Sequence, residues 1–137
     1  MQKGVDYIGI GSGAVIINTE GKLFLAKRGP KSRNEVGKWD FPGGDVDFGE
    51  DLYDSIKREI EEETGLKIDV LEPYEVHSRI TYDKNHWITI AYKCNTENSD
   101  IKLSYEHSEY KWVNLEEFNK LDAVDKIIMF AKKAYDK

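Results

Sequence analysis

The chain has 137 residues, of which 39% are hydrophobic, and this length and composition predict a single folded domain spanning residues 1–137. Its formal net charge of −6 argues against a nucleic-acid polymer or an anionic membrane as the main partner. Cys94 is the single cysteine and cannot form an internal disulfide, and no apolar run fits a signal peptide or a membrane span. We therefore expect a cytoplasmic protein.

Two strands and a basic loop are predicted for the first part of the chain. Residues 7–18 are rich in Ile, Val and Gly, and residues 22–28 alternate Leu23 and Leu25 after a turn at 18–21, so each stretch predicts a strand. The following loop, residues 27–38, holds five positive charges against one negative charge. It is either a solvated surface loop or a place where cations hold the phosphate groups of a ligand.

A helix is predicted between Asp51 and Gly65. Asp51 is a good N-cap residue, Asp54 lies near the positive end of the helix, and Gly65 provides the usual C-terminal stop. At about 100° per residue, one apolar stripe forms along this helix. The stripe consists of Leu52, Ile56 and Ile60.

Three carboxylates gather on the edge of this helix that should meet the rest of the domain. Glu59, Glu62 and Glu63 lie along and beside the apolar stripe. They repel one another, and partial burial makes the repulsion worse. A divalent cation would remove the conflict, and hard oxygen ligands suit Mg²⁺ or Mn²⁺. The sequence therefore predicts a metal site on this helix.

The second half of the chain predicts more strands and two helices. Residues 67–82 and 86–94 form two strands, and residues 103–113 contain a third. Asn114 and Glu117 resemble a capping box that starts a short helix over 115–121, and Asp122 is expected to cap a final helix. The apolar face of the final helix comprises Val124, Ile127, Ile128, Ala131 and Tyr135. This pattern indicates an α/β or α+β fold.

The stretch from residue 44 to residue 66 resembles the Nudix box. The family pattern is Gly, five residues, Glu, seven residues, Arg-Glu, an aliphatic residue, one residue, Glu-Glu, one residue, Gly and an aliphatic residue. The matching positions are Gly44, Glu50, Arg58, Glu59, Ile60, Glu62, Glu63, Gly65 and Leu66. The preceding run, Trp39 to Gly44, resembles the Pro-Gly-Gly segment of MutT-like Nudix proteins. The resemblance implies an α/β/α sandwich with a mixed sheet, and Mg²⁺-dependent cleavage of a nucleoside diphosphate derivative.

The resemblance also implies roles for particular residues. The metal ligands would be Glu59, Glu62, Glu63, the carbonyl group of Gly43, and Glu106. The same glutamates, together with Arg58, would serve catalysis, and Arg58 is expected to orient a carboxylate. Arg28 would contact a phosphate, Asp40 the base, and Gly44 would let the substrate approach the backbone. Glu50 and Gly65 would support the box, with Glu50 either pairing with Arg58 or reaching the metal through water.

Four assignments stay open at this point. Glu109 competes with Glu106, and Asp40 could be a turn-stabilising residue. Trp39 is either a core residue, which is favoured, or a stacking platform. His107 is the only histidine near the expected site, but a surface role is the favoured interpretation for it.

The substrate follows less directly from the sequence. The chain is similar to MutT-type nucleoside triphosphate pyrophosphohydrolases. Alternatives are an NDP-sugar hydrolase or a dinucleoside polyphosphate hydrolase, for which Tyr82 is a weak indication, and a catalytically silent nucleotide-binding domain. Many relatives form dimers, so a homodimer is a further expectation.

Overall fold

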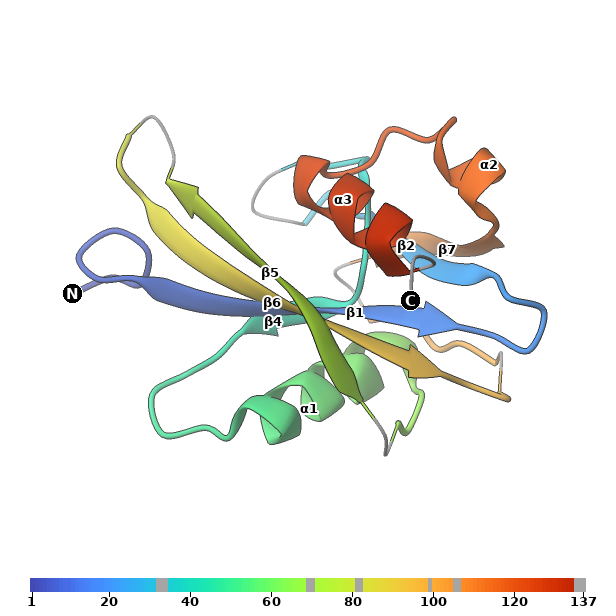
Figure 1. Cartoon of the computed structure of the whole chain (residues 1–137), viewed down its shortest axis with the longest axis horizontal. Coiled ribbons are helices and arrows are strands. Elements are labelled where there is room, and N and C mark those ends of the chain that lie inside the picture. The colour runs from blue at the N-terminus through green and yellow to red at the C-terminus, as the bar shows by residue number, and fades with distance from the viewer. Residues whose placement is uncertain (32–34, 69–70, 81–82, 99, 105–106, 135–137) are drawn as a thin grey trace.

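The computed structural model describes the chain apart from residues 32–34, 69–70, 81–82, 99, 105–106 and 135–137 (Figure 1). Its described elements follow one another along the chain as β1 (Gly9–Ile17), β2 (Leu23–Arg28), β3 (Trp39–Asp40), β4 (Gly43–Asp45), α1 (Leu52–Thr64), β5 (Glu72–Ile80), β6 (His86–Asn95), β7 (His107–Val113), α2 (Leu115–Phe118) and α3 (Asp125–Ala134).

The strands form one mixed sheet. β3, β2, β1, β6 and β5 are neighbours in that order, while β4 pairs with β1 and β7 pairs with β2. β1 and β6 run parallel, and the other pairs are antiparallel. β1 changes partner along its length, because residues 11–13 pair with β4 whereas Ile17 pairs with Leu23 of β2. This change places Gly44, the first residue of the stretch that resembles the Nudix box, beside Ser12 of β1.

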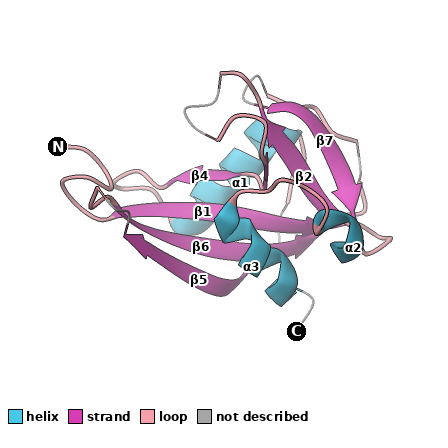
Figure 2. Cartoon of the chain, turned by 90° about the horizontal axis from the view of Figure 1, so that it is seen from above, coloured by secondary structure: helices cyan, strands magenta, loops and turns pink. Residues whose placement is uncertain are grey.

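Helices cover both faces of the sheet. α1 lies on one face and α3 on the other (Figure 1), and the view from above shows α3 crossing in front of the sheet with α1 behind it (Figure 2). Alternation along β1 serves both layers, since Ala14 and Ile16 pack on the α1 side whereas Val15 packs on the α3 side. The predicted fold class, an α/β/α sandwich with a mixed sheet, is confirmed.

Each layer has its own hydrophobic core. The α1-side core contains Ala14, Ile16, Phe24, Ala26, Ile56, Ile60, Leu66, Ile68, Tyr92 and Cys94. The α3-side core contains Val15, Leu23, Leu25, Trp39, Phe41, Ala91, Val113, Phe118, Ala123, Ile127, Phe130, Ala131 and Ala134. Trp39 is 5% exposed, which confirms its predicted place in the core.

The predicted start of the last helix is wrong. Asp122 does not cap it, because α3 begins three residues later, at Asp125. The Trp39 N–H donates to the Asp122 carbonyl (2.9 Å) and the Val124 N–H donates to the Trp39 carbonyl (2.9 Å). Residues 122–124 therefore extend the edge of the sheet, and α3 begins at Asp125. Ile128 is 38% exposed and does not belong to the buried face, while Tyr135 lies outside the described residues.

The shorter helix begins where the sequence predicts but ends at Phe118 and not at residue 121. α2 begins as predicted with a capping box, in which Asn114 Oδ1 accepts from the Glu117 N–H (2.8 Å) and Glu117 Oε1 accepts from the Asn114 N–H (3.2 Å). Among the described helices, none is both long and apolar enough to cross a bilayer.

Candidate active site

Local capping sets the position of α1. Asp51 Oδ1 accepts hydrogen bonds from the N–H groups of Tyr53 (2.9 Å) and Asp54 (3.1 Å). At the other end Gly65 has φ 79°, and its N–H donates to the Glu61 carbonyl (2.9 Å). A residue with a side chain is disfavoured at that φ, so Gly65 supports the box by ending the helix where the sequence predicts.

The buried face of α1 is rotated from the predicted stripe. Ile56 and Ile60 are fully buried, but Leu52 is 38% exposed. The row continues through Glu63, which is 6% exposed, whereas the Glu62 side chain is 58% exposed. Because positions 56, 60 and 63 follow i, i+4 and i+3 steps along one face, Glu62 falls outside it. The prediction that all three carboxylates lie on the packed edge is therefore wrong for Glu62.

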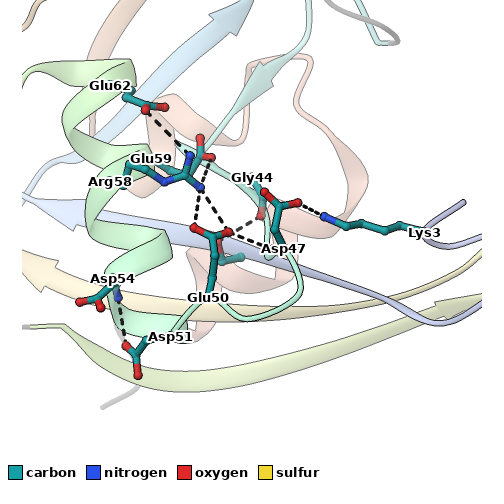
Figure 3. A network of polar contacts seen from close by, with 10 residues as sticks. Lys3, Gly44, Asp47, Glu50, Asp51, Asp54, Arg58, Glu59 and Glu62 are labelled. Atoms are coloured by element: carbon teal, nitrogen blue, oxygen red, sulfur yellow. Dashed lines mark hydrogen bonds and ion pairs between the residues drawn. The ribbon is translucent and has the colours of Figure 1, made fainter.

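Arg58 contacts two partly buried carboxylates, Glu50 and Glu59, and lies near the exposed Glu62 (Figure 3). Its Nη2 lies 3.1 Å from Glu50 Oε2 and 3.3 Å from Glu59 Oε1, and its Nη1 lies 3.9 Å from Glu62 Oε1. The positive guanidinium offsets the repulsion among three carboxylates that would otherwise crowd one another. Arg58 thus orients carboxylates, and Glu50 pairs with it.

Gly43 allows β4 to lie close to β1, and Gly44 allows the Glu59 side chain of α1 to lie close to β4. A Cβ atom on Gly43 would lie 2.0 Å from the Ser12 carbonyl oxygen, and one on Gly44 would lie 2.7 Å from Glu59 Cδ. The Gly43 N–H donates to Glu63 Oε2 (2.9 Å), and the Ser12 hydroxyl donates to the Gly44 carbonyl (3.2 Å). The two glycines therefore place backbone groups directly beside two of the box carboxylates.

Glu63 and His107 form a buried pair next to Gly43. His107 Nε2 lies 3.9 Å from Glu63 Oε1, and the two side chains are 5% and 8% exposed. The expected surface role of His107 is therefore wrong, because its side chain is buried beside a box carboxylate.

A β-bulge explains the position of His107. β7 pairs Glu109 with Lys27 and His107 with Arg28, so two residues of β7 advance for one residue of β2. Such a bulge turns a side chain to the opposite face of the sheet. Glu109 remains on the other face of the sheet, 3.4 Å from Lys27, and therefore does not lie beside the box carboxylates.

Arg28 and Asp40 face each other on adjacent strands. Arg28 Nη1 lies 3.0 Å from Asp40 Oδ2, Asp40 Oδ1 accepts from the Phe41 N–H (2.8 Å), and Asp40 is 7% exposed. The sequence treats the two residues as separate contacts for phosphate and base. In the structure they form one pair, and the backbone contact of Asp40 agrees with its alternative, turn-stabilising interpretation.

Other residues of the basic loop have different surroundings. Lys38 lies 3.9 Å from Glu35, Lys31 is exposed, and Arg33 lies outside the described residues. The amino groups of Lys27 and Lys111 lie 5.9 and 5.2 Å from the centre of the Trp39 ring. The two lysines therefore make cation–π contacts with Trp39 on the α3 side of the sheet, and the ring does not face the box helix.

The donor atoms beside α1 suit a hard divalent cation. Carboxylate and carbonyl oxygens are the ligands that Mg²⁺ and Mn²⁺ prefer. Glu59 and Glu62 both lie near Arg58, which offsets part of their negative charge. Within the part of the chain that the structure describes, no three His, Cys, Asp or Glu residues form a ready-made metal site. Glu106, predicted as a further ligand, lies outside the described residues, as does Tyr82.

Comparisons with known proteins identify the family. The model of the NUDIX domain matches residues 8–132. An RNA pyrophosphohydrolase from Pelagibacter ubique (strain HTCC1062) is 32% identical over 128 residues, covering 81% of this chain and 79% of the relative. A nucleoside triphosphatase NudI from Enterobacter sp. (strain 638) is 28% identical over 117 residues, covering 78% and 83%. The MutT protein from Methanosarcina mazei Go1 has a similar structure, with a TM-score of 0.80, 32% identity and 94% coverage of both chains.

The chain therefore belongs to the NUDIX domain family. It is a hydrolase of the MutT-like type, a class that acts on pyrophosphate bonds of nucleotides and generally uses divalent metal ions.

Proposed function

We propose that this protein hydrolyses nucleoside or deoxynucleoside triphosphates to the monophosphate and pyrophosphate, with Mg²⁺ as cofactor and Mn²⁺ as a substitute. The observation that carries the proposal is the placement of Glu59 and Glu63 against the backbone of Gly43 and Gly44. Relatives named nucleoside triphosphatase and a MutT structure support the triphosphate substrate.

The metal would be held by Glu59, Glu62, Glu63 and the Gly43 carbonyl, with Glu106 as a further candidate. A bound divalent cation neutralises charge on phosphoryl oxygens and lowers the pKa of water. The chain supplies the remaining functions. Arg58 and Glu50 hold Glu59 in place, and a carboxylate that is not coordinated accepts the proton from the attacking water.

The substrate would extend from the box toward β2 and β3. Arg28 supplies positive charge for a phosphate group, and Asp40 offers a carboxylate to an amino group of the base. Because the two residues pair with each other, substrate binding would exchange part of this ion pair for contacts with the ligand. The Gly44 backbone leaves room for the phosphates next to Glu59.

Two other kinds of substrate belong in the test. An NDP-sugar or a dinucleoside polyphosphate contains the same pyrophosphate linkage, and a relative named RNA pyrophosphohydrolase makes a triphosphorylated RNA end a direct comparison. The acidic charge of −6 argues against the RNA polymer. The intact box argues against a silent nucleotide-binding domain. A homodimer is a further expectation, which the molecular mass in solution will test.

The experiment is a substrate panel with product identification. The purified protein is incubated with Mg²⁺ and each common nucleoside triphosphate, an NDP-sugar, a dinucleoside polyphosphate and a 5′-triphosphorylated RNA. We expect the highest kcat/KM with a triphosphate, release of pyrophosphate and not of orthophosphate, and loss of turnover with EDTA. Hydrolysis of another substrate class at a higher kcat/KM, or no hydrolysis of triphosphates by the folded protein, would overturn the proposal.

A further inference from the structure

The N-terminal residues 2–7 form a closed turn, called the N-terminal turn below. The Gly4 N–H donates to the Tyr7 carbonyl (2.7 Å), and the Asp6 N–H donates to the Gln2 carbonyl (2.9 Å). The Gln2 N–H in turn donates to Asp6 Oδ2 (2.6 Å). These bonds close the turn on itself before β1 begins.

The N-terminal turn is packed against the start of β6. A Cβ atom on Gly4 would lie 2.2 Å from Nε1 of Trp87, and one on Gly9 would lie 2.6 Å from the same ring. The His86 N–H donates to the Gly4 carbonyl (2.6 Å). The indole ring is thus enclosed by two glycines, and Gly4 has φ 77°, which favours glycine. Packing therefore holds this turn in one position.

From that position Lys3 reaches the loop between β4 and α1. Its amino group donates to Asp47 Oδ1 (Figure 3), and the Lys3 side chain is 24% exposed. The hydrogen bond with Asp47 raises the pKa of Lys3, and the same bond holds the pKa of Asp47 below its usual value. Both ends of the contact therefore favour the charged forms.

Asp47 continues the connection to the box helix. Its N–H donates to Glu50 Oε1 (2.8 Å), and the Glu50 N–H donates back to the Asp47 carbonyl (3.0 Å). Glu50 Oε2 then lies 3.1 Å from Arg58, which lies 3.3 Å from Glu59 Oε1. A continuous set of polar contacts thus runs from Lys3 to a proposed metal ligand (Figure 3).

We propose that Lys3 is a positioning residue for hydrolysis. Through its contact with Asp47, Lys3 anchors the loop of residues 46–50 to the N-terminal turn. The anchored loop keeps Glu50 in contact with Arg58, and Arg58 in contact with Glu59. This inference rests on the proposed function for its kinetic part only. Lys3 touches neither substrate nor metal in this scheme, so it should affect kcat and the Mg²⁺ requirement while KM for the nucleotide stays the same.

The first test compares Lys3→Met with Lys3→Arg. Because the ion pair is solvent-accessible, we expect Lys3→Met to lower kcat by about twofold to fivefold and to raise the Mg²⁺ concentration for half-maximal rate. Lys3→Arg should retain near-normal values because it keeps the charge and the donors. Asp47→Asn should add no further loss in the Lys3→Met background. Lys133→Met is the matched control, since it removes an ion pair between Lys133 of α3 and Glu75 of β5 (2.5 Å), away from this loop.

The second test does not depend on activity. Amide hydrogen exchange in residues 46–50 should be faster in Lys3→Met and unchanged in Lys133→Met. Gly4→Val should accelerate it further because a side chain there collides with Trp87. Gly21→Val is its control, with a similar φ of 75° but no atom within 4 Å of the added Cβ.

Unchanged exchange and unchanged kcat in Lys3→Met would refute the positioning role while leaving the hydrolase assignment intact. If the wild-type protein hydrolyses no nucleotide, the proposed function fails. Hydrogen exchange then still decides whether Lys3 holds the loop. If residues 46–50 exchange as fast in Lys3→Met as in the wild type, Lys3 does not hold the loop.

Discussion

The two sides of α1 place neighbouring glutamates in opposite environments. On the exposed side, the Glu62 side chain is 58% exposed and lies 3.9 Å from Arg58. On the buried side, the Glu63 side chain is 8% exposed, accepts from the Gly43 N–H and lies 3.9 Å from His107. One residue of difference along the helix thus decides whether a carboxylate lies beside an exposed arginine or accepts a hydrogen bond from the backbone of the sheet.

The different burial of Glu62 and Glu63 predicts different contributions to stability. An exposed ion pair contributes about 0–1 kcal/mol to stability, because water screens the charges and the side chains lose entropy. A buried donor left without its acceptor costs about 1–3 kcal/mol. We therefore expect both glutamates to matter for metal-dependent hydrolysis, but only Glu63 to matter for folding.

The largest expected effect is on turnover. Glu62→Gln and Glu63→Gln each remove a negative charge with little change of shape, and each should lower kcat by at least about 10²-fold, the scale of losing a metal or acid–base group. Steady-state kinetics at saturating Mg²⁺ would measure the loss, with circular dichroism as the check of folding. Glu61→Gln is the matched control on the same helix. Near-normal turnover in both folded variants would remove these glutamates from the site.

Truncation should then separate the two sides. Glu63→Ala leaves the partly buried Gly43 N–H without this acceptor and empties a buried site, so the free energy of unfolding should fall by about 1–3 kcal/mol. Glu62→Ala changes an exposed side chain and should stay within about 0.5 kcal/mol of the wild type. Urea denaturation measures both values. Equal losses in the two variants would show that burial does not distinguish the two glutamates.

A second buried carboxylate extends the comparison to substrate choice. Asp40→Asn keeps the shape and one acceptor oxygen but removes the charge that pairs with Arg28. We expect the ranking of bases, measured as kcat/KM, to change by about tenfold or more. Arg28→Ala should instead show a penalty that decreases for substrates with fewer phosphates. A uniform loss on every nucleotide in both variants would assign the pair a structural role.

The smallest effect concerns Cys94, which lies in the core beneath α1. Burial raises the pKa of its thiol from 9.0 to about 12, so the folded protein holds this proton more tightly than the unfolded chain. The resulting stability is fully present below about pH 9 and decreases as the pH rises toward 12. At pH 8 iodoacetamide should label native Cys94 far more slowly than denatured protein, and Glu63→Ala should increase the rate more than Glu62→Ala. Rapid labelling of the native wild type would contradict this burial.

Local sequence determined the box helix and its ends. Asp51 and Gly65 act through hydrogen bonds to residues within four positions, and the Asn114–Glu117 capping box does the same. Arg58, Glu59, Glu62 and Glu63 also lie on one helix as predicted, although the exposure of Glu62 was predicted wrongly. These features could be predicted because every partner lies on the same turn or the next one.

Tertiary structure decided the remaining parts of the site. The bulge opposite Lys27 and Arg28 turns His107 toward Glu63, although simple alternation would place His107 on the same face as Glu109. Pairing between β2 and β3 brings Arg28 next to Asp40. Ala123 pairs with Trp39, so residue 123 is extended and the last helix begins only at Asp125. The physical reason is common to all three. Strand register depends on which distant segment supplies the hydrogen-bond partners, and a shift of one residue reverses the face on which each side chain lies.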